Sequence, residues 1–299
     1  MDILQIQGLC KRFGDKEVLR GVDLTVPEKR VFGFVGKNGA GKTTTMKLIL
    51  GLLKPDAGEI SVAGERVAYG RTSGRAPIGY LPDVPEFYSF MTAAEYLSLC
   101  GELAGMSATE RRRRGGELLS LVGLSGEKHR IRGYSRGMKQ RLGIAQALLG
   151  KPCLLLCDEP TSALDPIGRK EILDILSAIK EETTVLFSTH ILSDVEKICT
   201  DVAFLQDGRV AVEGRLEDIR RRYRKDEYRI EMERPEDAAR LLAVFSCLRR
   251  EDDGCLRLCQ TGEELFSVLS FIAENQLSLV RTERCEPTLE ALFEEVVQR

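Results

Sequence analysis

Residues 36–43 read Gly36-Lys37-Asn38-Gly39-Ala40-Gly41-Lys42-Thr43. They match the pattern G-x-x-x-x-G-K-[ST], they follow a short apolar run at 31–35, and they precede a segment at 43–53 whose apolar residues have helical spacing. In such a loop, the backbone N–H groups and the positive end of the following helix surround a phosphate group. The stretch therefore predicts a phosphate-binding loop between a buried strand and a helix.

The side chains of this loop have distinct predicted tasks. Lys42 is expected to reach the β- and γ-phosphate oxygens of ATP, and the Thr43 hydroxyl is expected to bind Mg²⁺. The other residues of the loop that we expect to bind the nucleotide are Gly36, Asn38, Gly39, Ala40, Gly41 and Thr44. A purely structural glycine turn is the alternative, and the complete match to the pattern after a strand weighs against it.

A second buried strand is predicted just before two acidic residues. The run Cys153–Cys157 is apolar throughout, which is typical of a strand covered on both faces, and Asp158 and Glu159 follow it directly. We expect Asp158 to hold the Mg²⁺ ion and Glu159 to act as the general base on the attacking water. Taken alone, the acidic pair would be read as the start of a turn or helix, and the upstream phosphate loop favours the catalytic interpretation.

Three further motifs give the sequence a specific resemblance. Residues 133–142 read Gly-Tyr-Ser-Arg-Gly-Met-Lys-Gln-Arg-Leu, residues 161–165 read Thr-Ser-Ala-Leu-Asp, and a predicted buried strand at 184–189 is followed by His190. Together with the phosphate loop and the acidic pair, and in this order, they resemble the signature, D-loop and switch histidine of the ATP-binding subunits of ABC transporters. The resemblance covers about residues 1–220.

This resemblance implies that ATP is held between two ATPase subunits. Ser135 and Gly137, at the start of a predicted helix, would bind the γ-phosphate that the phosphate loop of a second copy holds. Asp165 would contact the second copy across the same interface, and His190 would take part in catalysis by sensing the γ-phosphate. Hydrolysis would then separate the two subunits and move the membrane partner.

Four positions depart from the residues that are usual in this family. Phe13 stands where a tyrosine commonly stacks on adenine, with packing in the core as the alternative. Asp83, in a segment that resembles the Q-loop, replaces a glutamine; its carboxylate can still bind Mg²⁺ but cannot donate a hydrogen bond. Arg136 and Met138 replace a glycine and a glutamine of the signature. We expect Arg136 either to attract the γ-phosphate or to face solvent.

The region between Asp83 and Tyr134 has helical patterns at 93–103 and 111–122. It resembles the helical subdomain of the family, here about residues 84–150, which presents the signature and receives the membrane subunit. An apolar docking surface is expected from Pro82, Pro85, Phe87, Tyr88, Phe90 and Met91. Packing within the subdomain is the alternative for these residues. We expect the run Arg111–Arg114 to form a solvated helix face, with contact to anionic lipid as the alternative.

The flanking regions complete the predicted fold. Alternation at 3–8 predicts an edge strand, which pairs antiparallel with a strand at 18–26. After Gly214, alternating strands and helices predict a small α+β domain of ferredoxin-like type. Its expected strands are 228–232, 255–259 and 277–283, and its expected helices are 235–246, 262–273 and 287–298. We therefore predict an α/β P-loop NTPase domain at 1–219, with a helical and an antiparallel β subdomain, and an α+β accessory domain at 220–299.

Composition limits the partners and the location. Lys and Arg number 44 against 46 Asp and Glu, for a formal charge of -2, so no basic field favours nucleic acid as a partner. No segment approaches the roughly 18 apolar residues of a membrane span, and the first residues lack the basic start of a signal peptide. We expect a cytoplasmic chain, peripheral on the inner face of the cell membrane. Its expected partners are a separate integral-membrane permease and a second ATPase subunit, in a homodimer or a heterodimer.

Two other classes share these motifs. DNA-repair and chromosome ATPases separate the phosphate loop from the signature by a long coiled coil, and the spacer here is short and has no heptads. Soluble translation factors normally carry two such domains, whereas this sequence has one phosphate loop. Among transporters, the signature and the short C-terminal extension most resemble exporters of drugs, peptide antibiotics or lipid-like substrates. An importer ATPase or a non-transport regulatory complex is the alternative.

Overall fold

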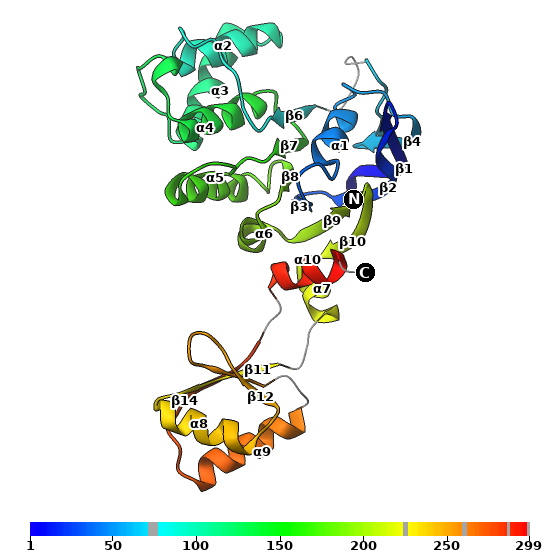
Figure 1. Ribbon diagram of the computed structural model, residues 1–299. Coiled ribbons are helices and arrows are strands. Elements are labelled where there is room, and N and C mark those ends of the chain that lie inside the picture. The colour runs from blue at the N-terminus through cyan, green and yellow to red at the C-terminus, as the bar shows by residue number, and fades with distance from the viewer. Residues whose placement is uncertain (71–76, 224–226, 259–261, 286–287, 298–299) are drawn as a thin grey trace. The chain divides into compact units, whose positions relative to one another are not determined.

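The structure is a computed structural model that describes residues 1–70, 77–223, 227–258, 262–285 and 288–297. The chain divides into two compact units, one formed mainly by Met1–Glu217 and the other by Asp218–Glu295. In Figure 1 the first unit runs from blue to yellow-green and the second from yellow to red. Residues 259, 287 and 298, which belong to predicted elements of the second unit, lie outside the described residues.

The first unit opens with an antiparallel sheet in the order β2-β1-β4-β5. Its strands are β1 (Asp2–Phe13), β2 (Lys16–Pro27), β4 (Ala57–Val62) and β5 (Glu65–Arg66). The predicted antiparallel pairing of the first two strands is confirmed, but β1 also pairs with β4, so its prediction as an edge strand is wrong. The alternation of apolar and polar residues indicates that one face of β1 is buried, through Leu4, Ile6 and Leu9. It does not indicate whether the strand pairs with one neighbouring strand or with two.

A six-stranded sheet in the order β10-β9-β3-β8-β7-β6 forms the centre of this unit. Its strands are β3 (Val31–Val35), β6 (Ile78–Leu81), β7 (Leu154–Asp158), β8 (Thr184–Thr189), β9 (Asp201–Gln206) and β10 (Arg209–Arg215). All neighbours pair in parallel except β9 and β10. Every residue of β3, β7 and β8 is buried, as their apolar runs predict. Because parallel strands share a carboxyl edge, the loops after β3, β6, β7 and β8 meet there.

Helices pack beside this central sheet (Figure 1). They are α1 (Lys42–Ile49), α5 (Pro166–Ala178) and α6 (Leu192–Ile198). The first is shorter than the helix predicted at 43–53, because Gly51 adopts a left-handed backbone with a φ of 65° and ends it. The core of the unit contains four fully buried phenylalanines, Phe32, Phe34, Phe187 and Phe204.

Three α-helices and a short 3-10 helix, η1 (Ile131–Gly133), lie between β6 and β7 in the chain and form the helical region. The α-helices are α2 (Ala93–Leu103), α3 (Ala108–Leu121) and α4 (Arg136–Ala147). Each begins after a hydroxyl residue, Thr92, Ser107 or Ser135, whose side chain accepts a hydrogen bond from a backbone N–H of the first turn. Among the described residues, no helix is long and apolar enough to cross a lipid bilayer.

The arginine run on α3 is only partly solvated, so its prediction as a solvated face is wrong for two of its members. Arg111 is half-buried and forms an ion pair with Glu102 at 2.5 Å. Arg114 donates a hydrogen bond to the carbonyl oxygen of Leu148 over 3.1 Å. Helical periodicity explains the split, because residues three apart lie on the same side of a helix and the pair 111 and 114 faces inward.

The second unit has the chain order βαββαβ and a four-stranded sheet in the order β12-β13-β11-β14. Its elements are β11 (Tyr228–Met232), α8 (Pro235–Val244), β12 (Leu248–Arg250), β13 (Leu256–Leu258), α9 (Gly262–Glu274) and β14 (Leu279–Arg284). All its strand pairs are antiparallel, which confirms the ferredoxin-like prediction. β12 was not predicted, because only the first of its residues, Leu248, is apolar and buried, so no alternation shows in the sequence. Helices α7 (Leu216–Arg222) and α10 (Leu289–Val297) flank these elements in the chain.

Candidate nucleotide-binding site

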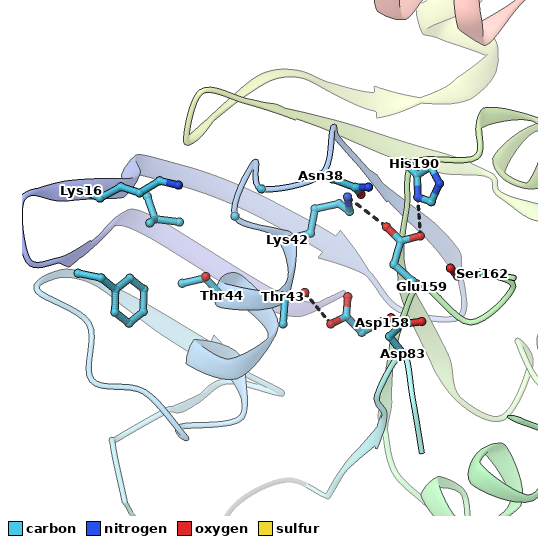
Figure 2. A pocket seen from close by; sticks show the side chains of 14 residues that line it. Lys16, Asn38, Lys42, Thr43, Thr44, Asp83, Asp158, Glu159, Ser162 and His190 are labelled. Atoms are coloured by element: carbon cyan, nitrogen blue, oxygen red, sulfur yellow. Dashed lines mark hydrogen bonds and ion pairs between the residues drawn. The ribbon is translucent and has the colours of Figure 1, made fainter. Parts of the chain in front are cut away.

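A cavity of about 610 Å³ opens at the carboxyl edge of the central sheet. This volume lies within the usual range for small-molecule sites. Most of the predicted site residues line it together: Phe13, Asn38, Gly39, Gly41, Lys42, Thr43, Thr44, Asp83, Asp158, Glu159 and His190. Figure 2 shows Lys42 and His190 both directed at Glu159, and Thr43 directed at Asp158. Three further residues of the lining, Lys16, Val18 and Ser162, were not predicted.

The conformation of the phosphate loop requires its glycines. Gly39 and Gly41 have φ values of 83° and 114°, in the left-handed region that other residues rarely adopt. A Cβ at Gly36 would lie 2.6 Å from the carbonyl oxygen of Leu205, closer than any side chain could tolerate. Helix α1 follows with no described side-chain cap, so the N–H groups of its first turn are available to an anion.

Lys42 lies on the floor of the cavity, and its side chain is only 6% exposed. Its ammonium nitrogen Nζ donates to the carbonyl oxygens of Gly36 and Lys37 over 2.7 and 3.3 Å. The same nitrogen lies 3.1 Å from Oε1 of Glu159. The loop therefore holds its cation beside the predicted general base, at the point where the loop and the acidic pair meet.

Two hydroxyl groups hold the buried carboxylate of Asp158. The Thr43 hydroxyl donates to Oδ2 over 2.7 Å, and the Ser188 hydroxyl donates to Oδ1 over 2.5 Å. Ser188 was not predicted, although it lies in β8 directly opposite Asp158 in the strand pairing. The signal that marks it is its position directly after the apolar run Val185–Phe187 and two residues before His190. Thr43 and Asp158 together offer the oxygen donors that Mg²⁺ prefers.

Glu159 is held at both its backbone and its side chain. Its backbone has a φ of 48°, a left-handed conformation that is costly for a residue with a side chain and that clusters at functional sites. Its N–H donates to the carbonyl oxygen of Ser188 over 3.1 Å. Its Oε2 lies 2.9 Å from Nδ1 of His190, while Oε1 faces Lys42. The carboxylate is thus directed into the cavity by two basic side chains.

Asp83 lies at the rim of the cavity, just after β6. Burial raises the pKa of its carboxyl group, and the negative charges of Asp158 and Glu159 raise it further, whereas Arg136 and His190 lower it. Oδ1 of Asp83 lies 3.4 Å from a guanidinium nitrogen of Arg136. The side chain of Arg136 is thus 45% exposed to solvent and at the same time contacts Asp83, a contact that neither sequence interpretation included. Its attraction to a γ-phosphate stays a prediction.

The aromatic ring of Phe13 is 48% exposed and lines the cavity, so its alternative interpretation as a core residue is wrong. Lys11 places its ammonium 5.4 Å from the ring centroid. A face-exposed ring at the mouth of the cavity can stack on a planar base. Its role in adenine binding stays a prediction.

Four described residues that were predicted to bind the nucleotide lie outside the lining of this cavity: Gly36, Ala40, Ser135 and Gly137. The first two support the loop, since the N–H of Gly36 donates to the carbonyl oxygen of Thr189 and Ala40 packs on the core. Ser135 caps α4, and its hydroxyl accepts from the N–H of Met138 over 3.2 Å. Asp165 likewise caps α5. Contacts of these residues with a second copy stay predictions.

Removal of the loop cation is expected to weaken ATP binding about 100-fold, because hydrogen bonds to charged groups are worth up to about 3 kcal/mol. The variant is Lys42→Ala, and isothermal titration calorimetry measures its affinity for ATP. Lys37→Ala is the matched control, since it removes an exposed lysine from the same loop and keeps the backbone carbonyl that Lys42 contacts. Unchanged affinity of Lys42→Ala for ATP would contradict the assignment of this cavity to the nucleotide.

Two family models match the chain. Residues 19–162 match the model described as ABC transporter, and residues 214–297 match the model described as ATP-binding protein DrrA1-3-like, C-terminal domain. The uncharacterized ABC transporter ATP-binding protein YxlF of Bacillus subtilis is 46% identical over 219 residues, which cover 73% of this chain and 72% of the relative. The bacitracin transport ATP-binding protein BcrA of Enterococcus faecalis is 32% identical over 305 residues, which cover 99% and 96%.

The fold is also similar to that of solved structures. One is an ATP-binding cassette described as a dimeric post-hydrolysis state bound to ADP and phosphate. It aligns with a TM-score of 0.63 and 27% identity, over 71% of this chain and 98% of its own. The ABC transporter model, which matches residues 19–162, spans the phosphate loop and the acidic pair and ends before His190. The chain therefore belongs to the family of ABC transporter ATP-binding proteins.

Proposed function

We propose that this chain is the ATP-hydrolysing motor of an exporter, and that it drives a substrate through a separate membrane subunit by ATP-dependent dimerisation. The observation that carries the proposal is the convergence of Lys42, Asp158, Glu159 and His190 in one cavity. These residues supply a phosphate-binding cation, a metal-binding carboxylate, a base and a group that orients the base.

The residues of the cavity fit ATP with Mg²⁺. The left-handed glycines and the uncapped start of α1 suit a polyphosphate. The side-chain oxygens of Thr43 and Asp158, which would be ligands of the metal, already lie 2.7 Å apart in a hydrogen bond. Asp83 is a third oxygen donor at the rim. Bound Mg²⁺ would neutralise charge on the phosphates and polarise them.

Hydrolysis would then use groups that this chain already brings together. Lys42 pairs with Glu159 at 3.1 Å, and a bound phosphate would compete for its ammonium and so release one carboxylate oxygen. Glu159 would take the proton of the attacking water, while His190, 2.9 Å away, keeps the carboxylate in place. The buried position of Lys42 limits competition from water at the phosphate.

The position of the signature supports dimerisation. Ser135 and Gly137 do not line the cavity of their own chain, which is consistent with a contact to the γ-phosphate of a second copy. The helix α4 that begins after Ser135 directs its positive end outward to such an anion. The similar ATP-binding cassette bound to ADP and phosphate is described as dimeric, which supports this arrangement.

The helical region offers a surface for the membrane subunit. Val84, Tyr88 and Phe90 are 62%, 56% and 60% exposed, and the last two rings lie 6.0 Å apart. Phe87, another residue of the predicted docking surface, instead packs edge-on against Tyr96 at 5.1 Å and supports the helices from inside. Exposed apolar and aromatic side chains of this kind are suited to contact with a membrane subunit. The chain would thus lie on the inner face of the membrane.

Export of a peptide antibiotic can be tested in inverted membrane vesicles that carry this chain and the membrane protein encoded beside its gene. Bacitracin is the probe, since a relative that spans nearly the whole chain is named for bacitracin transport. Added ATP reaches the cytoplasmic face of such vesicles, so an exporter should accumulate labelled bacitracin in the lumen, and vesicles with Lys42→Ala should not. ATP hydrolysis without accumulation would contradict this substrate, and ATP-driven loss from preloaded vesicles would indicate an importer.

A further inference from the structure

Two of the positions that depart from the usual family residues contact each other within this chain. Asp83 follows β6 and lines the nucleotide cavity, whereas Arg136 is the first residue of α4 and adjoins Ser135. The guanidinium nitrogen Nη2 of Arg136 lies 3.4 Å from Oδ1 of Asp83. The contact joins two motifs that are 53 residues apart, one at the cavity and one at the predicted interface.

The backbone around this ion pair is held firmly. Gln140 of α4 is fully buried and donates from Nε2 to the carbonyl oxygen of Asp83 over 2.6 Å. Gly143 of the same helix packs so closely on this segment that a Cβ there would lie 2.5 Å from Cδ1 of Leu81 and 3.4 Å from Cβ of Pro85. The ion pair can therefore open by side-chain rotation while the backbone of the segment stays attached to α4.

The energetics favour an exchange of partners. The side chains of Arg136 and Asp83 are 45% and 47% exposed, and ion pairs at that exposure are weak. Asp158 and Glu159 also repel the Asp83 carboxylate, so it sits in a cluster of negative charge at the cavity. A divalent cation bound among these carboxylates would attract Asp83 more strongly than a half-solvated guanidinium does.

We propose that Arg136 is a positioning residue that couples the two ATP sites of the dimer. While the cavity of its own chain has no nucleotide, Arg136 forms the ion pair with Asp83. When Asp83 binds Mg²⁺ instead, the ion pair breaks and Arg136 can contact the ATP of the opposite site. The inference rests on the proposed function, because it requires that the start of α4 faces the nucleotide of a second copy. Asp83 belongs to one composite site and Arg136 to the other. Binding of Mg-ATP at the first site therefore makes Arg136 available to bind ATP at the second.

The link between the two residues can be measured by titration of Mg²⁺ into the monomeric chain with a non-hydrolysable ATP analogue bound. Arg136→Gln is expected to tighten Mg²⁺ binding about fivefold, equivalent to about 1 kcal/mol, because the ion pair no longer competes for Asp83. In an Asp83→Asn background, the same substitution should leave Mg²⁺ affinity unchanged. Arg112→Gln, at an exposed position of α3, is the matched control for loss of one positive charge. Equal shifts in both backgrounds, or a shift in neither, would overturn the link.

The release of Arg136 to the opposite site can be measured as dimer affinity. In a Glu159→Gln background with Mg-ATP, Arg136→Gln is expected to weaken the dimer at least about tenfold in analytical ultracentrifugation, since one charge-assisted contact to phosphate is lost at each of the two sites. Arg136→Lys, which keeps the charge, should restore most of the affinity. If Glu159→Gln alone forms no dimer, the proposed function fails. If that chain dimerises equally well with and without Arg136→Gln, only the coupling of the two sites is wrong.

Discussion

A Glu159→Gln chain is expected to bind ATP normally and to hydrolyse it about 10²–10⁴-fold more slowly, because glutamine cannot accept the proton of the attacking water. The amide has the shape of the carboxylate and can still hydrogen-bond with His190, so the cavity keeps its form. In the structure, the carboxylate lies 3.1 Å from the ammonium of Lys42 and 2.9 Å from His190. Loss of the charge also frees Lys42 for the phosphates, which favours retention of ATP.

Retained ATP should be visible as a stable dimer. With Mg-ATP, Glu159→Gln is expected to elute from a size-exclusion column as a dimer and to return to the monomer with ADP, while the unmodified chain stays largely monomeric. Glu181→Gln changes an exposed carboxylate outside the cavity, so it should hydrolyse ATP at the unmodified rate. A Glu159→Gln chain that hydrolyses ATP normally would remove Glu159 from the role of base. One that hydrolyses slowly and stays monomeric with ATP would contradict ATP-driven dimerisation.

The convergence of the main site residues is predictable because each follows a buried parallel strand. The phosphate loop, Asp158–Glu159 and His190 come at the ends of three buried strands, and the carboxyl ends of parallel strands meet at one edge of a sheet. No knowledge of packing is needed for this step. Because these residues lie at the carboxyl ends of adjacent strands, their side chains can line the same cavity.

Contacts that depend on strand register or on packing between distant segments are not predictable in this way. Ser188 reaches Asp158 because β7 and β8 pair in one particular register, and a shift by one residue would turn the hydroxyl to the other face. The contact of Asp83 with Arg136 depends on how α4 packs on β6, where Gly79 and Gly143 permit close approach. Asp83 and Arg136 each depart from the usual family residue, but no pattern in the sequence indicates that they contact each other.

The ends of helices and strands, and which strands lie at a sheet edge, are also not predictable from local sequence patterns. The alternation of β1 is equally compatible with one neighbour or two, and only the pairing with β4 decides between them. The end of α1 depends on the left-handed backbone at Gly51, whereas the apolar spacing continues to Leu53. Local patterns thus indicate which face of an element is buried. Strand pairing and backbone conformation determine the neighbours of that element and the residue at which it ends.

Ser135→Arg is expected to reduce ATP hydrolysis at least about 100-fold while ATP binding in the cavity is kept, because a bulky cation at the start of α4 would block closure onto a second copy. Ser135 also caps α4, so part of any effect could come from a less stable helix, worth about 1 kcal/mol. Ser107→Arg is the matched control, since Ser107 caps α3 in the same way. Thermal unfolding of both variants measures the contribution of the cap, and only Ser135→Arg should lose hydrolysis.

Mixing Ser135→Arg chains with Lys42→Ala chains then tests whether each site is shared between two copies. In a mixed dimer, both lesions fall on one composite site, and the other site combines an intact phosphate loop with an intact signature. Random mixing should therefore recover about a quarter of the unmodified ATPase activity, because half of the dimers are mixed and each has one intact site. Each parent alone should be nearly inactive. If mixed dimers form and show no recovery, either the signature acts within its own chain or both sites must bind ATP before either can hydrolyse it.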